Sequence, residues 1–374
     1  MPDNVTDIIG GGGHTLFLTA NGRCYSCGWN SKGQLGLGLV GQQNEVTVPK
    51  PISEQYFSES FIKVAAGWDH SMTITGNDVY TCGSGRKGQL GYCGPDGKPV
   101  SKSDNFMKAM EQFTGAIAMV ERSKVADEIK DVNFISIFSD SSIDSSIMEQ
   151  ELFYLQYIVN STPIARFMTS IQVERGDSIS VFKAMQKVPL PDCCGRIIQV
   201  AAGANHSALV TDTGQLIVWG DNKHGQLAMD PDLKPVQHEP VILPEHLFEK
   251  EKIVQVYSGW THMLALTETG LVYTWGRAKY GQLGTAGASD ENSSRWQPHL
   301  LAITNPKRIV CGAEHNMLIS DGDELLTWGW NEHGMCGSGD TVDIFEPQKI
   351  QSFTHWKVTA IGCGSGHSFA CVTS

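Results

Sequence analysis

A short step of the form Gly-x-x-His recurs six times along this chain of 374 residues. A second motif, in which Trp or Cys is followed by Gly and then by a turn close to Gly-Gln-Leu-Gly, begins 12 or 13 residues after five of the histidines. Between the two motifs, strand-favouring apolar runs flank an Asp, Thr or Gly turn, which predicts a hairpin. The histidines are His14, His70, His206, His262, His315 and His367. A chain with this pattern is built from repeats of one small β unit.

The spacing of the histidines gives the length of the repeat. Successive histidines lie 52 to 56 residues apart, except that 136 residues separate His70 from His206. One ordinary repeat plus an insertion would fill this gap, so we expect a degenerate seventh copy there, with strands near residues 131–138 and 151–157. Residues 120–130 have a helical composition with acids and bases at i,i+4-type spacing, which predicts a partly helical insertion.

A unit of about 52–56 residues with several short strands cannot bury its faces alone, whereas sheets stacked radially around an axis can. We therefore predict an all-β fold, a seven-bladed β-propeller with one degenerate blade. No second motif follows His367 or precedes His14, so we also expect one blade to be incomplete at the termini, with exposed strand edges. We expect one domain overall, with N-terminal blades in 1–94, the degenerate blade and insertion in 95–195 and C-terminal blades in 196–374.

The charge of the chain restricts its partners. With 28 basic and 40 acidic residues the formal net charge is −12, which argues against nucleic-acid binding. No apolar run approaches the roughly 20 residues of a membrane span, and the first residues lack a signal-peptide pattern. Ten cysteines without a regular disulfide framework indicate a reducing compartment. We therefore expect a monomer in the cytoplasm, the nucleus or both.

Several residue patterns suggest chemistry that their context does not support. The motif histidines lie in different blades, so they cannot converge on one metal ion. Cys24 and Cys27 have CxxC spacing, but on a strand positions three apart point to opposite faces. The Gly-rich run 36–41 does not join a strand to a helix, as a dinucleotide site requires. With no nucleophile beside a base, we predict no catalytic residue, no metal and no cofactor, and a binding or regulatory protein rather than an enzyme.

Loop positions that differ between repeats are the best candidates for recognition, because scaffold residues repeat and recognition residues need not. The loops before each histidine and after each Trp-Gly step mix Trp, Tyr, Arg, Lys and His, the residue types that anchor protein interfaces. The alternative is that each Trp packs on the adjacent blade and the charges are only solvated. The candidate partner-binding residues are Trp68, Asp69, Lys223, His224, Trp260, Arg277, Lys279, Tyr280, Trp330, Glu332 and His333.

The alternation of Gly-x-x-His with Trp-Gly-x-Asn-x-x-Gly-Gln-Leu-Gly resembles the repeat of the regulator of chromosome condensation family over residues 8–93 and 196–371. That family's domain is a seven-bladed propeller. Within it, residues 259–284 and 328–337 are most similar to guanine nucleotide exchange factors linked to secretion. The resemblance implies a regulator of a small GTPase that speeds nucleotide release without covalent chemistry, with an exocyst subunit as a further partner. The alternative is an interaction scaffold without exchange activity, since a fold does not fix a function.

Overall fold

A computed structural model of the chain describes residues 4–38, 44–52, 60–92, 135–143, 148–159, 162–174, 181–191, 195–285, 294–353 and 356–373. Two compact units are present, one of Met1–Pro99 with Ser180–Ser374 and the other of Val100–Ile179. Within the described ranges the elements are β-strands and two short 3-10 helices, η3 (Glu245–Phe248) and η4 (Gln351–Phe353). None of the described helical turns has the length or hydropathy of a membrane span.

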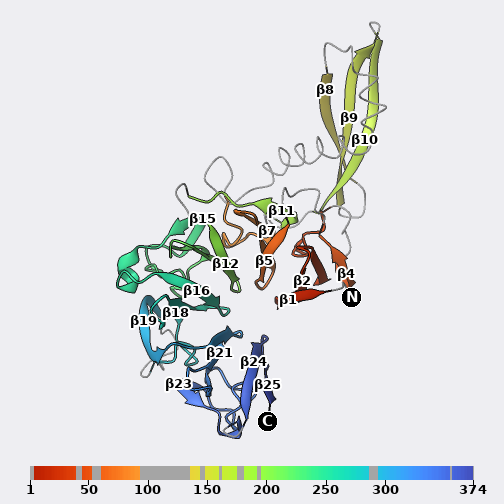
Figure 1. Cartoon of the computed structure of the whole chain (residues 1–374). Coiled ribbons are helices and arrows are strands. Elements are labelled where there is room, and N and C mark those ends of the chain that lie inside the picture. The colour runs from red at the N-terminus through yellow and green to blue at the C-terminus, as the bar shows by residue number, and fades with distance from the viewer. Residues whose placement is uncertain are drawn as a thin grey trace. The chain divides into compact units, whose positions relative to one another are not determined.

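The first unit contains five antiparallel sheets of four strands each, which are the blades of a propeller (Figure 1). Blade one is β1 (Val5–Gly10), β2 (His14–Thr19), β3 (Cys24–Trp29) and β4 (Glu45–Pro51). Blade two is β5 (Phe61–Ala66), β6 (His70–Thr75), β7 (Asp78–Ser84) and β11 (Val181–Lys187). Blade three is β12 (Ile197–Ala202), β13 (His206–Thr211), β14 (Leu216–Asp221) and β15 (Val236–Ile242).

Blade four is β16 (Ile253–Ser258), β17 (His262–Thr267), β18 (Leu271–Arg277) and β19 (Ser294–Thr304). Blade five is β20 (Arg308–Cys311), β21 (His315–Ile319), β22 (Leu325–Gly329) and β23 (Ile344–Lys349). A sheet of two strands, β24 (Lys357–Cys363) and β25 (Ser368–Thr373), follows blade five. The second unit is a three-stranded antiparallel sheet of β8 (Ile135–Ile143), β9 (Met148–Val159) and β10 (Thr162–Glu174).

The all-β propeller architecture is confirmed, but the predicted count of seven blades is wrong, because the residues that the structure describes form five blades of four strands. The error lies in the long gap between His70 and His206. Blade two is interrupted after its third strand, and β11 returns after the insertion to pair with β7 as the fourth. Blades two and three are direct neighbours, since His70 Nε2 lies 3.0 Å from Ser207 Oγ.

The segment predicted to be a degenerate blade is therefore an insertion within blade two. Its described strands, β8 to β10, form a sheet of their own rather than a four-stranded blade. The predicted helical insertion is not seen, because the described residues contain no α-helix; the stretch 120–130 lies outside them. Spacing arithmetic cannot distinguish an insertion within a repeat from an additional repeat, which explains both errors.

The motif histidines link each blade to the next. In the first five motif histidines, Nε2 of the imidazole lies 2.8–3.0 Å from the side chain of the residue that follows the next motif histidine. The five partners are Ser71, Ser207, Met263, Asn316 and Ser368. The glycine of the motif is needed because the imidazole lies on it: a Cβ at Gly203 would lie 2.0 Å from the ring of His206. The histidines are thus part of the propeller's scaffold.

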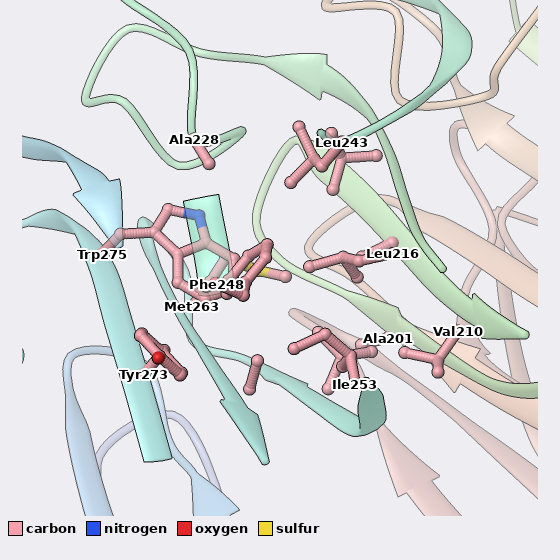
Figure 2. Close-up of a cluster of buried hydrophobic side chains, with 14 of the residues drawn as sticks. Ala201, Val210, Leu216, Ala228, Leu243, Phe248, Ile253, Met263, Tyr273 and Trp275 are labelled. Carbon is pink, nitrogen blue, oxygen red and sulfur yellow. The ribbon is translucent and has the colours of Figure 1, made fainter. Parts of the chain in front are cut away.

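The tryptophans that begin the second motif in blades three to five pack between neighbouring blades. Trp219, Trp275 and Trp328 are fully buried, and each indole Nε1 donates a hydrogen bond to a glutamine carbonyl of the preceding blade. Figure 2 shows the cluster that contains Trp275: Phe248, from η3 after blade three, lies beside the indole, and Leu216 of β14 belongs to the same cluster. Buried area of this kind is the main source of stability between stacked sheets.

Candidate functional site

The strand register brings both sets of candidate loops to one end of each blade. The motif histidine at the start of the second strand pairs with the glycine at the end of the third, as in His206 with Gly220 and His262 with Gly276. The Gly-x-x-His turns and the Trp-Gly turns therefore lie side by side. We call this end of the five blades the motif face, and we call the end that carries the turns between the second and third strands the opposite end.

The turns of the motif face are held by their own backbone and by repeated polar side chains. In four blades the glutamine of Gly-Gln-Leu-Gly accepts, through Oε1, the backbone N–H of the residue two positions earlier. The motif asparagines also hold the turns: Asn222 Oδ1 accepts the N–H of Leu227, and Asn331 Oδ1 accepts that of Cys336. The other side chains of these turns are consequently free to vary without loss of the turn.

Two of the predicted tryptophans meet although they come from different blades. The rings of Trp68 and Trp260 lie 4.4 Å apart between centroids, in an edge-to-face arrangement. Their loops are tied to neighbouring blades by backbone hydrogen bonds from Gly12 N to Trp68 O and from Ala204 N to Trp260 O. Trp68 nevertheless remains 39% exposed. The pair forms a rigid aromatic patch that is partly open to solvent.

A second cluster joins blades four and five. The guanidinium of Arg277 lies 4.9 Å from the centroid of the Tyr280 ring, and the ammonium of Lys279 lies 5.3 Å from it. The Tyr280 ring is 6.2 Å from that of Trp330, which also contacts His333 at 5.6 Å. These five predicted residues therefore form one aromatic and cationic cluster.

The remaining predicted residues lie around these clusters. Trp330 Nε1 donates to Glu332 at 3.2 Å. Burial raises the pKa of Asp69, against the lowering effect of Lys32 and Arg86.

The two candidates of blade three, Lys223 and His224, lie on the turn that follows β14. Lys223 is exposed. Burial lowers the pKa of His224, and the nearby charges of Arg277 and Lys223 lower it further, so its imidazole is neutral at pH 7. All eleven predicted residues occupy the motif face, and whether they bind a partner stays a prediction.

Glu314 is a buried carboxylate of this face that the sequence-based prediction did not include. It is only 5% exposed and receives hydrogen bonds from Thr261 Oγ1 at 2.6 Å and from Gln282 Nε2 at 2.7 Å. Arg277 Nη1 lies 3.9 Å from Glu314 Oε1, so the carboxylate orients the guanidinium of the aromatic cluster. Burial alone would raise the pKa of Glu314, but its contacts with His262, Thr261 and Gln282 outweigh this and lower it.

One signal in the sequence could have identified Glu314. The position before each motif histidine reads Gly13, Asp69, Asn205, Thr261, Glu314 and Gly366. Asp69 and Glu314 are the two acidic residues at this position of the repeat. That Glu314 is buried becomes evident only from its contacts in the fold.

The described residues offer little for metal or thiol chemistry. They contain no group of three or more His, Cys, Asp or Glu side chains placed to hold a metal ion. Burial raises the pKa of Cys24 to about 12, so this thiol stays protonated and unreactive at neutral pH. Cys193 and Cys194 lie outside the described residues.

Comparison with known families agrees with the repeat pattern. The model of the RCC1-like domain matches residues 168–370, and models of the regulator of chromosome condensation (RCC1) repeat match residues 21–74 and 5–34. The chain belongs to the regulator of chromosome condensation repeat family. Its match to the first model covers more than half of its length and spans blades three to five and the last sheet.

Individual members of this family are similar along nearly the whole chain. The secretion-regulating guanine nucleotide exchange factor of Mus musculus is 33% identical over 98% of this chain and 75% of its own length. The ultraviolet-B receptor UVR8 of Arabidopsis thaliana is 27% identical over 99% of this chain and 75% of its own. The solved structure of Prp20p from Saccharomyces cerevisiae superposes with a TM-score of 0.52 at 19% identity, covering 99% of this chain and 82% of that one, which shows the shared fold alone.

Proposed function

We propose that this chain binds a small GTPase through the motif face and accelerates release of its guanine nucleotide. The observation that carries the proposal is the pair of preformed clusters on that face, Trp68 with Trp260 and Arg277 with Tyr280 and Trp330. They belong to a chain that is 33% identical, over 98% of its length, to a guanine nucleotide exchange factor. Aromatic and arginine side chains held rigid before binding are the usual anchors of protein interfaces.

Nucleotide exchange needs no reactive group on the exchange factor. A protein that binds the nucleotide-free GTPase more tightly than the nucleotide-bound form shifts the equilibrium towards release by that difference in affinity. The residues of the motif face would supply this differential binding, because their loops are fixed to the blades and lose little entropy on binding. Glu314 would act as a positioning residue that holds Arg277 in its orientation.

The proposal is tested by measuring release of a fluorescent nucleotide from a panel of purified small GTPases. The wild-type chain should accelerate release from at least one of them, and Trp260→Ala should reduce the acceleration about tenfold or more. Trp356→Ala is a matched control, because Trp356 is 47% exposed and lies at the start of the last sheet, away from the motif face. Failure to accelerate release from any GTPase would contradict the proposal.

A scaffold without exchange activity is the second candidate. It is supported by the similarity of the plant receptor UVR8, which is 27% identical over 99% of this chain and whose name denotes a light receptor. A stable complex with a GTPase whose nucleotide release is unchanged would favour the scaffold. An exocyst subunit as partner, a role in secretion and the cellular compartment stay predictions of the family resemblance.

A further inference from the structure

Cations gather on the motif face although the chain as a whole carries a net charge of −12. The turn between the third and fourth strands holds at least one Lys or Arg in each of blades one to four. These positions are Lys32, Arg86, Lys87, Lys223 and Lys279, which we call the cationic arc. In blade five the equivalent positions hold Glu332 and His333. A basic run along one end of an acidic protein calls for a physical reason.

The fold does not require these cations. Each turn is fixed by a backbone N–H and the glutamine side chain two residues later, as for Lys32 N to Gln34 Oε1 and Lys87 N to Gln89 Oε1. His224 and Tyr280 occupy the same structural position in blades three and four and donate the same backbone bond. The turn therefore accepts side chains of any charge, and the repeated basic side chains are not explained by turn geometry.

Three cations of the arc, Lys32, Arg86 and Lys223, are not ion-paired among the described residues. Lys87 lies 4.0 Å from Asp221. The carboxylate of Asp69 interacts with Lys32 and Arg86, and that of Asp221 with Lys87 and Lys223, so two negative charges stand against these four cations. Blades one to three therefore carry an excess of positive over negative charge at these turns, and Lys32 and Arg86 interact with Asp69, the residue that follows Trp68 in the sequence.

We infer that the cationic arc binds an acidic surface segment of a protein partner, with the tryptophan pair as the apolar anchor beside it. This inference rests on the proposed function in one respect, namely that the acidic segment would belong to the small GTPase. A protein is favoured over a nucleic acid because four blades supply few cations, and the acidic remainder of the chain repels a long polyanion. Charges at the rim of an interface, as the cationic arc would be, mainly change the association rate constant and its dependence on salt concentration.

The experiment compares the wild-type chain with the double charge reversal Arg86→Glu with Lys223→Glu. The control is Lys50→Glu with Lys357→Glu, which makes the same change in net charge at two exposed positions in β4 and at the start of β24. The first probe is an octaglutamate peptide, followed by tryptophan fluorescence at low ionic strength. Wild type and control should bind it in a salt-sensitive manner, and the double reversal should lose binding. Equal binding by all three proteins would overturn the inference.

A second probe is any GTPase whose nucleotide release the chain accelerates. The double reversal should lower the association rate constant about tenfold and flatten its dependence on ionic strength, while the dissociation rate constant changes little. Normal acceleration with an unchanged association rate would overturn the inference and leave the proposed function intact. Octaglutamate binding without acceleration of any GTPase would overturn the proposed function alone. Tighter binding of an eight-nucleotide single-stranded DNA than of octaglutamate would contradict a protein partner.

Discussion

The two ends of the blades differ in how their charged side chains are paired. At the opposite end, charged groups pair with one another, as in Lys187 with Asp78 at 2.8 Å and Lys349 with Glu324 at 2.7 Å. At the motif face, Lys32, Arg86 and Lys223 have no such ion-pair partner among the described residues. The two ends therefore differ in their charges: Lys187 and Lys349 of the opposite end are ion-paired, whereas these three cations of the motif face are not ion-paired within the described part of the chain.

Lowering the pH tests the buried motif histidines of the scaffold and should have the largest effect on the free energy of unfolding. Burial lowers the pKa of His14 and His315 to about 4 and that of His70 and His206 to about 3. The unfolded chain binds protons near pH 6.5, so the free energy of unfolding falls as the pH decreases from 6.5 towards 3. At pH 5 the expected loss is roughly 1–2 kcal/mol for each histidine. Urea unfolding at pH 7, 6 and 5 measures this, and a constant free energy of unfolding would contradict it.

A pair of glycine substitutions tests the turns of the two ends separately. Gly203→Ala on the motif face would place a Cβ against the imidazole of His206 and should cost about 3 kcal/mol of stability. Gly322→Ala at the opposite end meets no atom closer than 3.8 Å and should change stability by less than about 0.5 kcal/mol. Thermal unfolding compares the two variants, and equal losses would show that the glycine of the motif is not required by the imidazole.

The buried carboxylate of the motif face gives a sharper test of positioning. Glu314→Gln keeps the size of the side chain but removes the charge near Arg277, so affinity for the partner should fall about fivefold to tenfold. A double-mutant cycle with Arg277→Lys should give a coupling energy of about 0.5–3 kcal/mol, as expected for residues in contact. Stability of each variant is followed in parallel. Additive effects on affinity would show that Glu314 does not act through Arg277.

The smallest effect is expected from an ion pair of the opposite end. Lys349→Ala removes the contact with Glu324, in which both side chains are about a third to a half exposed. Exposed pairs of this kind contribute little, so the free energy of unfolding should change by less than about 0.5 kcal/mol. Nucleotide release should not change. An effect on release similar to that of Trp260→Ala would remove the functional distinction between the two ends.

The sequence predicted the blades well wherever both motifs are present. The interval between Gly-x-x-His and Trp-Gly defines the second and third strands, so β13 and β14 lie where the hairpin around residues 212–215 was expected. The number of blades could not be obtained from spacing, because β7 and β11 belong to one sheet across an insertion. Contact between His70 and Ser207 is the observation that decides this, and it is visible only in three dimensions.

The candidate site was partly predictable for a similar reason. Loop positions that differ between repeats identified Trp68, Trp260 and Arg277, and the strand register then places them on one face. The contact between the two tryptophans could not be predicted, because it joins blades two and four. Glu314 was missed because its importance follows from burial and hydrogen bonds rather than from residue type.

The most direct test of the account is the footprint of a bound GTPase measured by hydrogen–deuterium exchange of backbone amides. On complex formation, exchange should become slower in the motif-face turns 29–34, 84–89, 221–226 and 277–282. Exchange should not change in the opposite-end turns 211–215, 267–270 and 320–325. Protection confined to the opposite-end turns would contradict the claim that the motif face is the surface that binds the partner.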